Sequence, residues 1–127
     1  VLEMSAKLFR KSGPELIMAD VRKFLSRYEN EFCIAASTPN FWEITAANVN
    51  KGSSLLKIAD MLGIKRKNVL AIGDSSNDDP MLQVAGIAFV PENAANSTKS
   101  LADVVVRDNN SHAVAAAIEW LDTNISE

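Results

Sequence analysis

The stretch that decides the fold runs from Val69 to Leu82 and reads Val-Leu-Ala-Ile-Gly-Asp-Ser-Ser-Asn-Asp-Asp-Pro-Met-Leu. Its first four residues are apolar and predict a buried strand, which leads directly into small, polar and acidic residues. Ligands of open α/β sheets bind at the carboxyl ends of the strands, so Asp74 stands where a strand delivers its side chain to a site. We expect Gly73 to let the backbone turn there.

Asp74 and Asp78 lie four residues apart across this predicted turn, so both carboxylates can point to one place. Carboxylate oxygens are hard ligands that suit Mg²⁺ better than softer metals, and magnesium in turn suggests a phosphorylated substrate. A structural interpretation is also open, in which Asp78 or Asp79 caps the helix that begins at Pro80 and Asp74 serves the turn. Capping explains one aspartate, but not three aspartates around Asn77.

Lys51 and Gly52 form the second informative feature, at the start of a helix predicted over residues 51–62. The helix dipole disfavours a cation there by a few tenths to ~1 kcal/mol, so something should compensate the charge. A bound anion would do so, since a lysine beside free helix amides forms a phosphate site and Gly52 permits close approach of the backbone. The alternative is a solvated lysine that points away, and position alone favours neither.

The residues before Asn48 have a different pattern from the rest of the chain. An amphipathic helix is predicted from residue 12 to about residue 28, followed by strands over residues 31–37 and 41–47. Proline and asparagine within residues 38–40 suit a tight turn between these strands. The order in this part of the chain is therefore helix, strand, strand.

From Asn48 onward, short apolar strands alternate with helices. Helices are predicted over residues 51–62, after Pro80 and over residues 97–101. Strands are predicted over residues 69–72, 87–90 and 104–106. A last helix keeps one apolar face, formed by Val114, Ile118, Leu121 and Ile125. Such alternation predicts an α/β fold with a parallel, doubly wound sheet.

The bulk composition narrows the function classes. The 127 residues include 47% apolar residues, enough for one core, and 13 basic against 16 acidic residues give a net charge of -3. This balance offers no broad surface for nucleic acid, and no apolar stretch reaches the roughly 20 residues that span a bilayer. We therefore expect a cytoplasmic protein. The lone cysteine, Cys33, excludes an internal disulfide and is expected to be a buried structural thiol.

Lys51-Gly52 at a helix start, followed about twenty residues later by Gly-Asp-x-x-Asn-Asp-x-x-Met-Leu, resembles the third and fourth motifs of haloacid dehalogenase (HAD) superfamily phosphatases. More narrowly, the pairs Asn93-Ala94 and Ala102-Asp103 resemble the Cof-type subclass. The resemblance implies a Rossmann-like core with an inserted α/β cap. Residues 1–47 would then be the C-terminal part of the cap, and residues 48–127 the C-terminal part of the core.

The same resemblance implies roles for individual residues. Asp74 and Asp78 would hold Mg²⁺, and Lys51 would neutralise the phosphate and orient the nucleophile. Asn77 would help to bind the phosphate. The predicted catalytic residues are thus Lys51, Asp74 and Asp78, with Lys51 and Asn77 binding the substrate.

The mechanism of such enzymes begins with an aspartate nucleophile in an Asp-x-Asp motif, which forms an aspartyl-phosphate that water then hydrolyses. This sequence has no Asp-x-Asp motif. Phosphoryl transfer depends on positioning and charge neutralisation around the nucleophile, so we expect the chain alone to be inactive. The start at Val1 favours a fragment of a longer enzyme. A missing first strand would expose a sheet edge, with the missing N-terminal segment or another copy of the chain as its expected partner.

The leading hypothesis is a magnesium-dependent phosphomonoesterase for a small phosphorylated metabolite, a sugar phosphate or phosphoglycolate, in its full-length form. A second hypothesis is a non-catalytic assembly module that needs a partner chain to complete the sheet. A third, the phosphorylation domain of an ion-pumping ATPase, shares the Gly-Asp-x-x-Asn-Asp element. The short distance from Lys51, the Met81-Leu82 pair and the absence of membrane segments from the sequence disfavour it.

Overall fold

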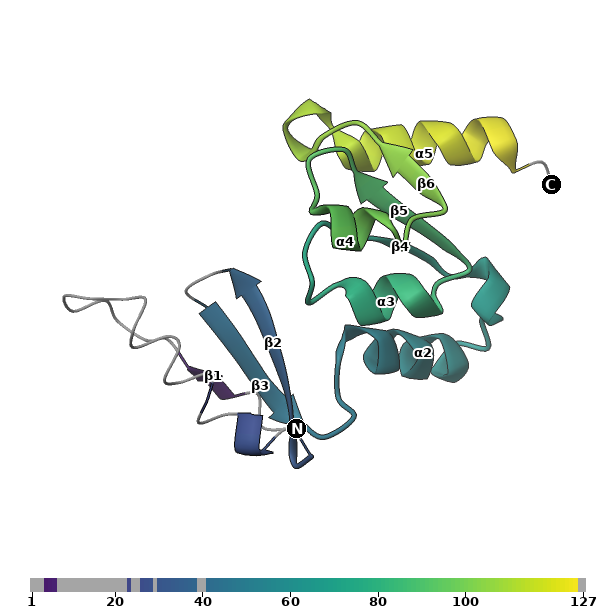
Figure 1. Ribbon diagram of the computed structural model, residues 1–127. Coiled ribbons are helices and arrows are strands. Elements are labelled where there is room, and N and C mark those ends of the chain that lie inside the picture. Colours follow the sequence, from purple (N-terminus) through teal and green to yellow (C-terminus); the bar gives the residue numbers. More distant parts are fainter. Residues whose placement is uncertain (1–3, 7–22, 24–25, 29, 39–40, 126–127) are drawn as a thin grey trace. The chain divides into compact units, whose positions relative to one another are not determined.

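The computed structural model describes residues 4–6, 23, 26–28, 30–38 and 41–125. The chain forms two compact units, residues 1–50 and residues 51–127 (Figure 1). The helix predicted from residue 12 lies largely outside the described residues; a short 3-10 helix, η1 (Ser26–Tyr28), occupies its expected end.

The first unit contains a three-stranded antiparallel sheet in the order β1-β3-β2. Its strands are β1 (Met4–Ala6), β2 (Phe32–Thr38) and β3 (Phe41–Ala46). The strands predicted over residues 31–37 and 41–47 are confirmed to within one residue at each end. Strand β1 was not predicted, because three residues are too few to show an alternating pattern.

The second unit contains a parallel sheet in the order β4-β5-β6. Its strands are β4 (Leu70–Ile72), β5 (Ile87–Pro91) and β6 (Val104–Val106). Ala71 pairs with Ala88, and Val90 pairs with Val105. Parallel strands need crossover connections, and the helices between them supply these. The α/β class with a parallel sheet is therefore confirmed.

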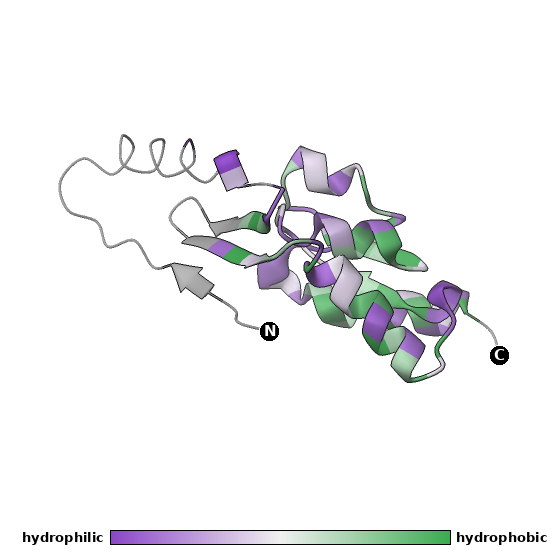
Figure 2. Ribbon diagram, turned by 90° about the horizontal axis from the view of Figure 1, so that it is seen from below, coloured by the Kyte–Doolittle hydropathy of each residue, from purple (hydrophilic) through white to green (hydrophobic). Residues whose placement is uncertain are grey.

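Helices cover both faces of the parallel sheet (Figure 1). They are α2 (Lys51–Met61), α3 (Asp79–Val84), α4 (Asn96–Lys99) and α5 (Ala113–Asn124), with 3-10 turns η2 (Arg66–Asn68) and η3 (Asn109–Ser111). On one face, Ala71, Ala88 and Val90 pack with Leu82 of α3 and with Ala94. Figure 2 shows hydrophobic colouring along these strands and a mixture of hydrophobic and hydrophilic colouring on the helices.

The opposite face of the sheet packs against α5. Phe89 and Val106 contact the buried residues Ala113 and Ala117, and the Phe89 ring meets Trp120 edge-to-face at a centroid distance of 5.6 Å. This edge-to-face geometry is a favourable one for aromatic pairs. Trp120 is therefore a packing residue of the core.

The buried face of α5 differs from the predicted one. Leu121 packs against the core, but Val114, Ile118 and Ile125 are each more than half exposed in this chain. The helix instead presents small alanines to the sheet, because small side chains let it lie close to Phe89. The large apolar residues that dominated the sequence pattern lie on its flank.

Two further expectations concern single features. Cys33 is a free, half-buried thiol in β2, less buried than the sequence predicted. Within the described residues, no helix has the length and apolar content needed to cross a bilayer.

Candidate metal and phosphate site

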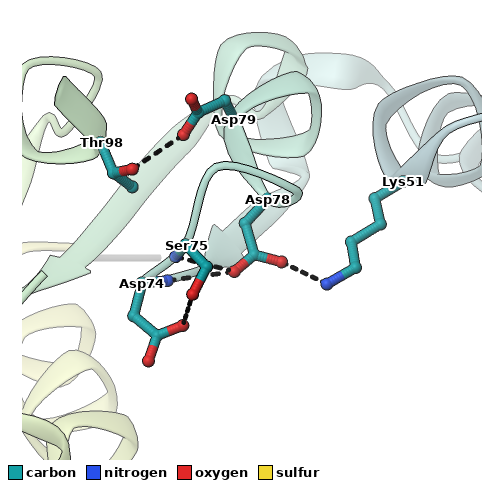
Figure 3. Close-up of polar contacts among 6 residues, drawn as sticks. All are labelled: Lys51, Asp74, Ser75, Asp78, Asp79 and Thr98. Atoms are coloured by element: carbon teal, nitrogen blue, oxygen red, sulfur yellow. Dashed lines mark hydrogen bonds and ion pairs between the residues drawn. The ribbon is translucent and has the colours of Figure 1, made fainter. Parts of the chain in front are cut away.

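A tight loop, residues 73–78, joins the carboxyl end of β4 to α3. The carboxylate of Asp78 closes this loop: its Oδ2 accepts the backbone N–H of Asp74 at 3.1 Å and that of Ser75 at 3.2 Å (Figure 3). Asp78 occupies the N-cap position of α3 but makes no capping bond with its side chain. The simple capping interpretation therefore does not describe Asp78, whose carboxylate folds the loop that precedes the helix.

The other carboxylate oxygen of Asp78 binds Lys51. Lys51 Nζ donates to Asp78 Oδ1 in an ion pair that joins residues 27 positions apart in the sequence. The Asp78 side chain is 10% exposed and that of Lys51 is 44% exposed. The cation at the start of α2 is thus compensated by a protein carboxylate, and the lysine does not point away from the site.

Two glycines permit this approach of α2 to the loop. A Cβ on Gly52 would clash with the backbone carbonyl of Pro80, so only glycine lets the start of α2 lie against the start of α3. A Cβ on Gly73 would lie 2.5 Å from the Cβ of Asp78. Gly73 does not have a positive φ. Both glycines are therefore required for close packing inside the protein. The turn does not need a positive φ at Gly73, and the approach of a ligand to Gly52 stays a prediction.

The side-chain oxygens of Asp74 and Asn77 differ from those of Asp78 in their hydrogen-bond partners. Asp74 is exposed, and its Oδ1 accepts the hydroxyl of Ser75 at 3.1 Å. Asn77 is buried, yet its Oδ1 has no hydrogen-bond partner among the residues that the structure describes. An unpaired buried carbonyl oxygen costs about 1–3 kcal/mol, so it calls for a functional explanation.

These oxygens are chemically suited to Mg²⁺, which prefers hard oxygen ligands and retains several waters. In the described part of the chain, no group of three or more His, Cys, Asp or Glu side chains is placed to hold a metal ion. The described residues therefore contribute hard oxygen donors, and Asp74 and Asn77 are the candidates among them for a metal or phosphate site.

Asp79 points away from the loop and toward α4. Its Oδ1 accepts the hydroxyl of Thr98 at 3.0 Å, and Thr98 is fully buried (Figure 3). Sequence reasoning missed Thr98, because 19 positions separate it from Asp79 and a threonine in a short helix gives no distinct pattern. Its burial became visible only with the fold.

The four predicted site residues all lie in or against this loop. Lys51 and Asp78 are in direct contact, and the amide of Asp74 binds Asp78. Asn77 belongs to the same loop.

The residue pairs that carry the Cof-type resemblance, Asn93-Ala94 and Ala102-Asp103, include residues with clear structural roles. Asn93 joins the loops that follow β5 and β6: its Nδ2 donates to Asn109 Oδ1 at 2.8 Å, and its Oδ1 accepts the Asn109 amide at 3.2 Å. Ala94 lies in the core. Asp103 Oδ2 accepts the amide of Ala88 at 2.8 Å and so aligns the starts of β5 and β6.

Known proteins resemble this chain over most of its length. The haloacid dehalogenase-like hydrolase family matches residues 6–118. A phosphoglycolate phosphatase of Methanopyrus kandleri is 40% identical over 80 residues, which are 63% of this chain and 34% of the relative. A 5-amino-6-(5-phospho-D-ribitylamino)uracil phosphatase of Bacillus subtilis is 37% identical over 96 residues, 75% of this chain and 39% of the relative.

A solved structure of a haloacid dehalogenase-like hydrolase from B. subtilis has the same fold, with a TM-score of 0.75 and 31% identity. The match covers 81% of this chain and 37% of that protein. The chain thus spans less than half the length of these relatives. The match to the family includes the parallel sheet, the loop after β4 and Lys51. The chain therefore belongs to the haloacid dehalogenase-like hydrolase family.

Proposed function

We propose that this chain forms the metal-binding and phosphate-binding part of a magnesium-dependent phosphatase, which hydrolyses phosphomonoesters through an aspartyl-phosphate. The observation that carries the proposal is the Lys51–Asp78 ion pair beside the exposed carboxylate of Asp74, at the carboxyl end of β4. The names of the two relatives support phosphatase activity.

Lys51 is proposed to bind the phosphoryl group of the substrate. Its ammonium group has three donors, so it can bind Asp78 and a phosphate oxygen at the same time. The ion pair fixes the position of this flexible side chain, while its partial exposure leaves it accessible to a ligand. A positioned cation of this kind stabilises the charge of the transferring phosphoryl group.

Asp74 is proposed as a direct ligand of Mg²⁺, with the unpaired Oδ1 of Asn77 as a second oxygen of the site, toward the ion or the phosphate. When bound, Mg²⁺ would neutralise charge on the phosphoryl oxygens. Metal binding by Asp78 stays a prediction, because both of its oxygens already accept protein donors. The role that the contacts support for Asp78 is to hold Lys51 and the loop.

The proposed nucleophile, an aspartate of an Asp-x-Asp motif, would lie in a part of the enzyme outside these 127 residues. The proposed division is the predicted one, with residues 1–47 in a cap and residues 48–127 in the catalytic core. The proposed substrates are small phosphorylated metabolites such as a sugar phosphate or phosphoglycolate; the named relatives act on phosphoglycolate and on a phosphoribitylamino-uracil. The cytoplasmic location stays a prediction, which cell fractionation would test.

The test uses the natural polypeptide that contains this chain, assayed for phosphate release from a panel of phosphorylated metabolites, with Mg²⁺ and with chelator. We expect Mg²⁺-dependent turnover that Asp74→Asn abolishes. Asp60→Asn, which neutralises an exposed aspartate of α2, is the matched control and should retain turnover. Turnover that persists in chelator, or that survives Asp74→Asn, would contradict the proposal.

A second candidate function, a non-catalytic assembly module, has its own structural support. In the described residues β4 has a neighbour on one side only, and Leu70 of this strand is 41% exposed. Unpaired strand edges are templates for pairing with further strands. The proposed partner at this edge is an upstream segment of the same polypeptide or another copy of the chain. A natural polypeptide that assembles through this edge but shows no turnover would favour this function over the first.

A further inference from the structure

We propose that Thr98 is a positioning residue for the loop that carries Asp74 and Asp78. Thr98 lies in α4, is fully buried, and donates its hydroxyl to Asp79 Oδ1 at 3.0 Å (Figure 3). The role in metal binding rests on the proposed function, whereas the role in holding the loop does not.

The apolar surroundings of Thr98 indicate that its hydroxyl is present for the bond to Asp79. A buried hydroxyl without a partner is costly, whereas valine has the same shape and needs no partner. The neighbouring residues Ala94 and Leu101 belong to the apolar cluster under the sheet. A threonine is therefore better explained at this position by its bond to Asp79 than by filling of the core.

The bond acts at the junction between the loop and α3. Asp79 is the first residue of α3, and the backbone carbonyl of Asp78 accepts the amides of Met81 at 2.8 Å and Leu82 at 3.0 Å. The two adjacent aspartates point in different directions: Asp78 binds the loop and Lys51, and Asp79 binds Thr98 (Figure 3). The start of α3 is thus held from two sides, so that loss of the Thr98 bond frees it to rotate and shifts the Asp78 carboxylate.

The first test is amide hydrogen exchange of the natural polypeptide without metal, comparing Thr98→Val and Thr98→Ser with the wild type. The amides of Asp74 and Ser75, both bound to Asp78 Oδ2, report on the loop. Thr98 is distant from them in sequence, so its substitution leaves their intrinsic exchange rates unchanged. The amide of Ala88, bound to Asp103, reports on general loosening of the core.

We expect Thr98→Val to accelerate exchange at the two loop amides by at least about fivefold relative to Ala88, and Thr98→Ser to keep the wild-type rates. Equal exchange in Thr98→Val and wild type, or equal acceleration in both variants, would overturn the proposal. Acceleration of the loop and Ala88 amides by the same factor would also overturn it, because that result means general destabilisation.

The second test measures Mg²⁺ binding to the same proteins by calorimetry, with Asp79→Asn added to form a double-mutant cycle. Thr98→Val should weaken binding several-fold, Thr98→Ser should not, and the effects of Thr98→Val and Asp79→Asn should be non-additive because the two residues act as one pair. Additive effects would contradict the pairing. If the wild type does not bind Mg²⁺, the proposed function fails, and the exchange comparison still decides the role of Thr98.

Discussion

At the residue scale, the two aspartates of the loop have different physical roles. Asp74 is exposed and accepts only the Ser75 hydroxyl in the described contacts, whereas Asp78 is buried and accepts Lys51 and two backbone amides. An exposed carboxylate can exchange water for a metal ion at little cost. A buried carboxylate that holds a loop contributes to folding.

Asp74→Asn and Asp78→Asn should therefore differ in their effect on the free energy of unfolding. Asp74→Asn removes an exposed charge and should change the free energy of unfolding by less than about 0.5 kcal/mol. Asp78→Asn replaces a charge-assisted acceptor of three donors and should lower it by about 1–3 kcal/mol. Urea unfolding of the natural polypeptide, monitored by circular dichroism, measures both values. Equal losses in the two variants would show that Asp78 does not hold the loop.

Lys51→Met should abolish Mg²⁺-dependent turnover by the natural polypeptide while costing only about 1 kcal/mol of folding stability, because the lost ion pair is partly exposed to solvent. Lys57→Met, an exposed lysine of the same helix, is the matched control. Phosphate-release assays and thermal melts of the two variants test this. Full activity in Lys51→Met would remove Lys51 from the proposed site.

At the scale of elements, the contact between α2 and α3 brings Lys51 to Asp78. Gly52→Ala favours the helix by up to about 1 kcal/mol through intrinsic propensity, yet its Cβ would clash with the carbonyl of Pro80. Overpacking of this kind costs about 1–3 kcal/mol, so we expect net destabilisation with loss of turnover. Ser54→Ala, at an exposed position of α2, provides the propensity change without the clash. A stabilised Gly52→Ala variant would contradict this packing.

The packing of α5 gives a second test at this scale. Ala117→Leu should lower the free energy of unfolding by about 1–3 kcal/mol, because the larger side chain cannot fit between the helix and Phe89. Ala115→Leu makes the same change at an exposed position and should stay within about 0.5 kcal/mol. Chemical unfolding of both variants compares the two faces of the helix. A larger loss in Ala115→Leu would show that the helix is rotated from the position described.

At the scale of the whole molecule, β4 lies at an edge of the parallel sheet in the described residues and carries exposed Leu70. We expect the isolated 127-residue chain to associate through this edge at micromolar concentrations, and Leu70→Lys to reduce the association, because a charge opposes strand pairing. Val105→Lys, on the opposite edge strand β6, is the control. Light scattering coupled to size exclusion measures the mass. Greater sensitivity to Val105→Lys would place the contact at β6.

Several parts of this fold were predictable because they depend on local sequence. The apolar runs in β2, β5 and β6 are bounded by turn residues, and each strand was predicted to within one residue. The motif residues Lys51, Asp74 and Asp78 were identified because lysine at a helix start and acidic residues at a strand end are locally unusual.

The sequence by itself thus determined the alternation of strands and helices, the family, and the residues of the loop after β4, since hydrophobic period and motif spacing are properties of neighbouring positions. Only the tertiary structure decided how those residues are used. The pairing of Lys51 with Asp78, the bond from Thr98 to Asp79 and the contact of Gly52 with Pro80 join residues 19 or more positions apart. Such contacts depend on how helices pack across a sheet, and local sequence does not encode that packing.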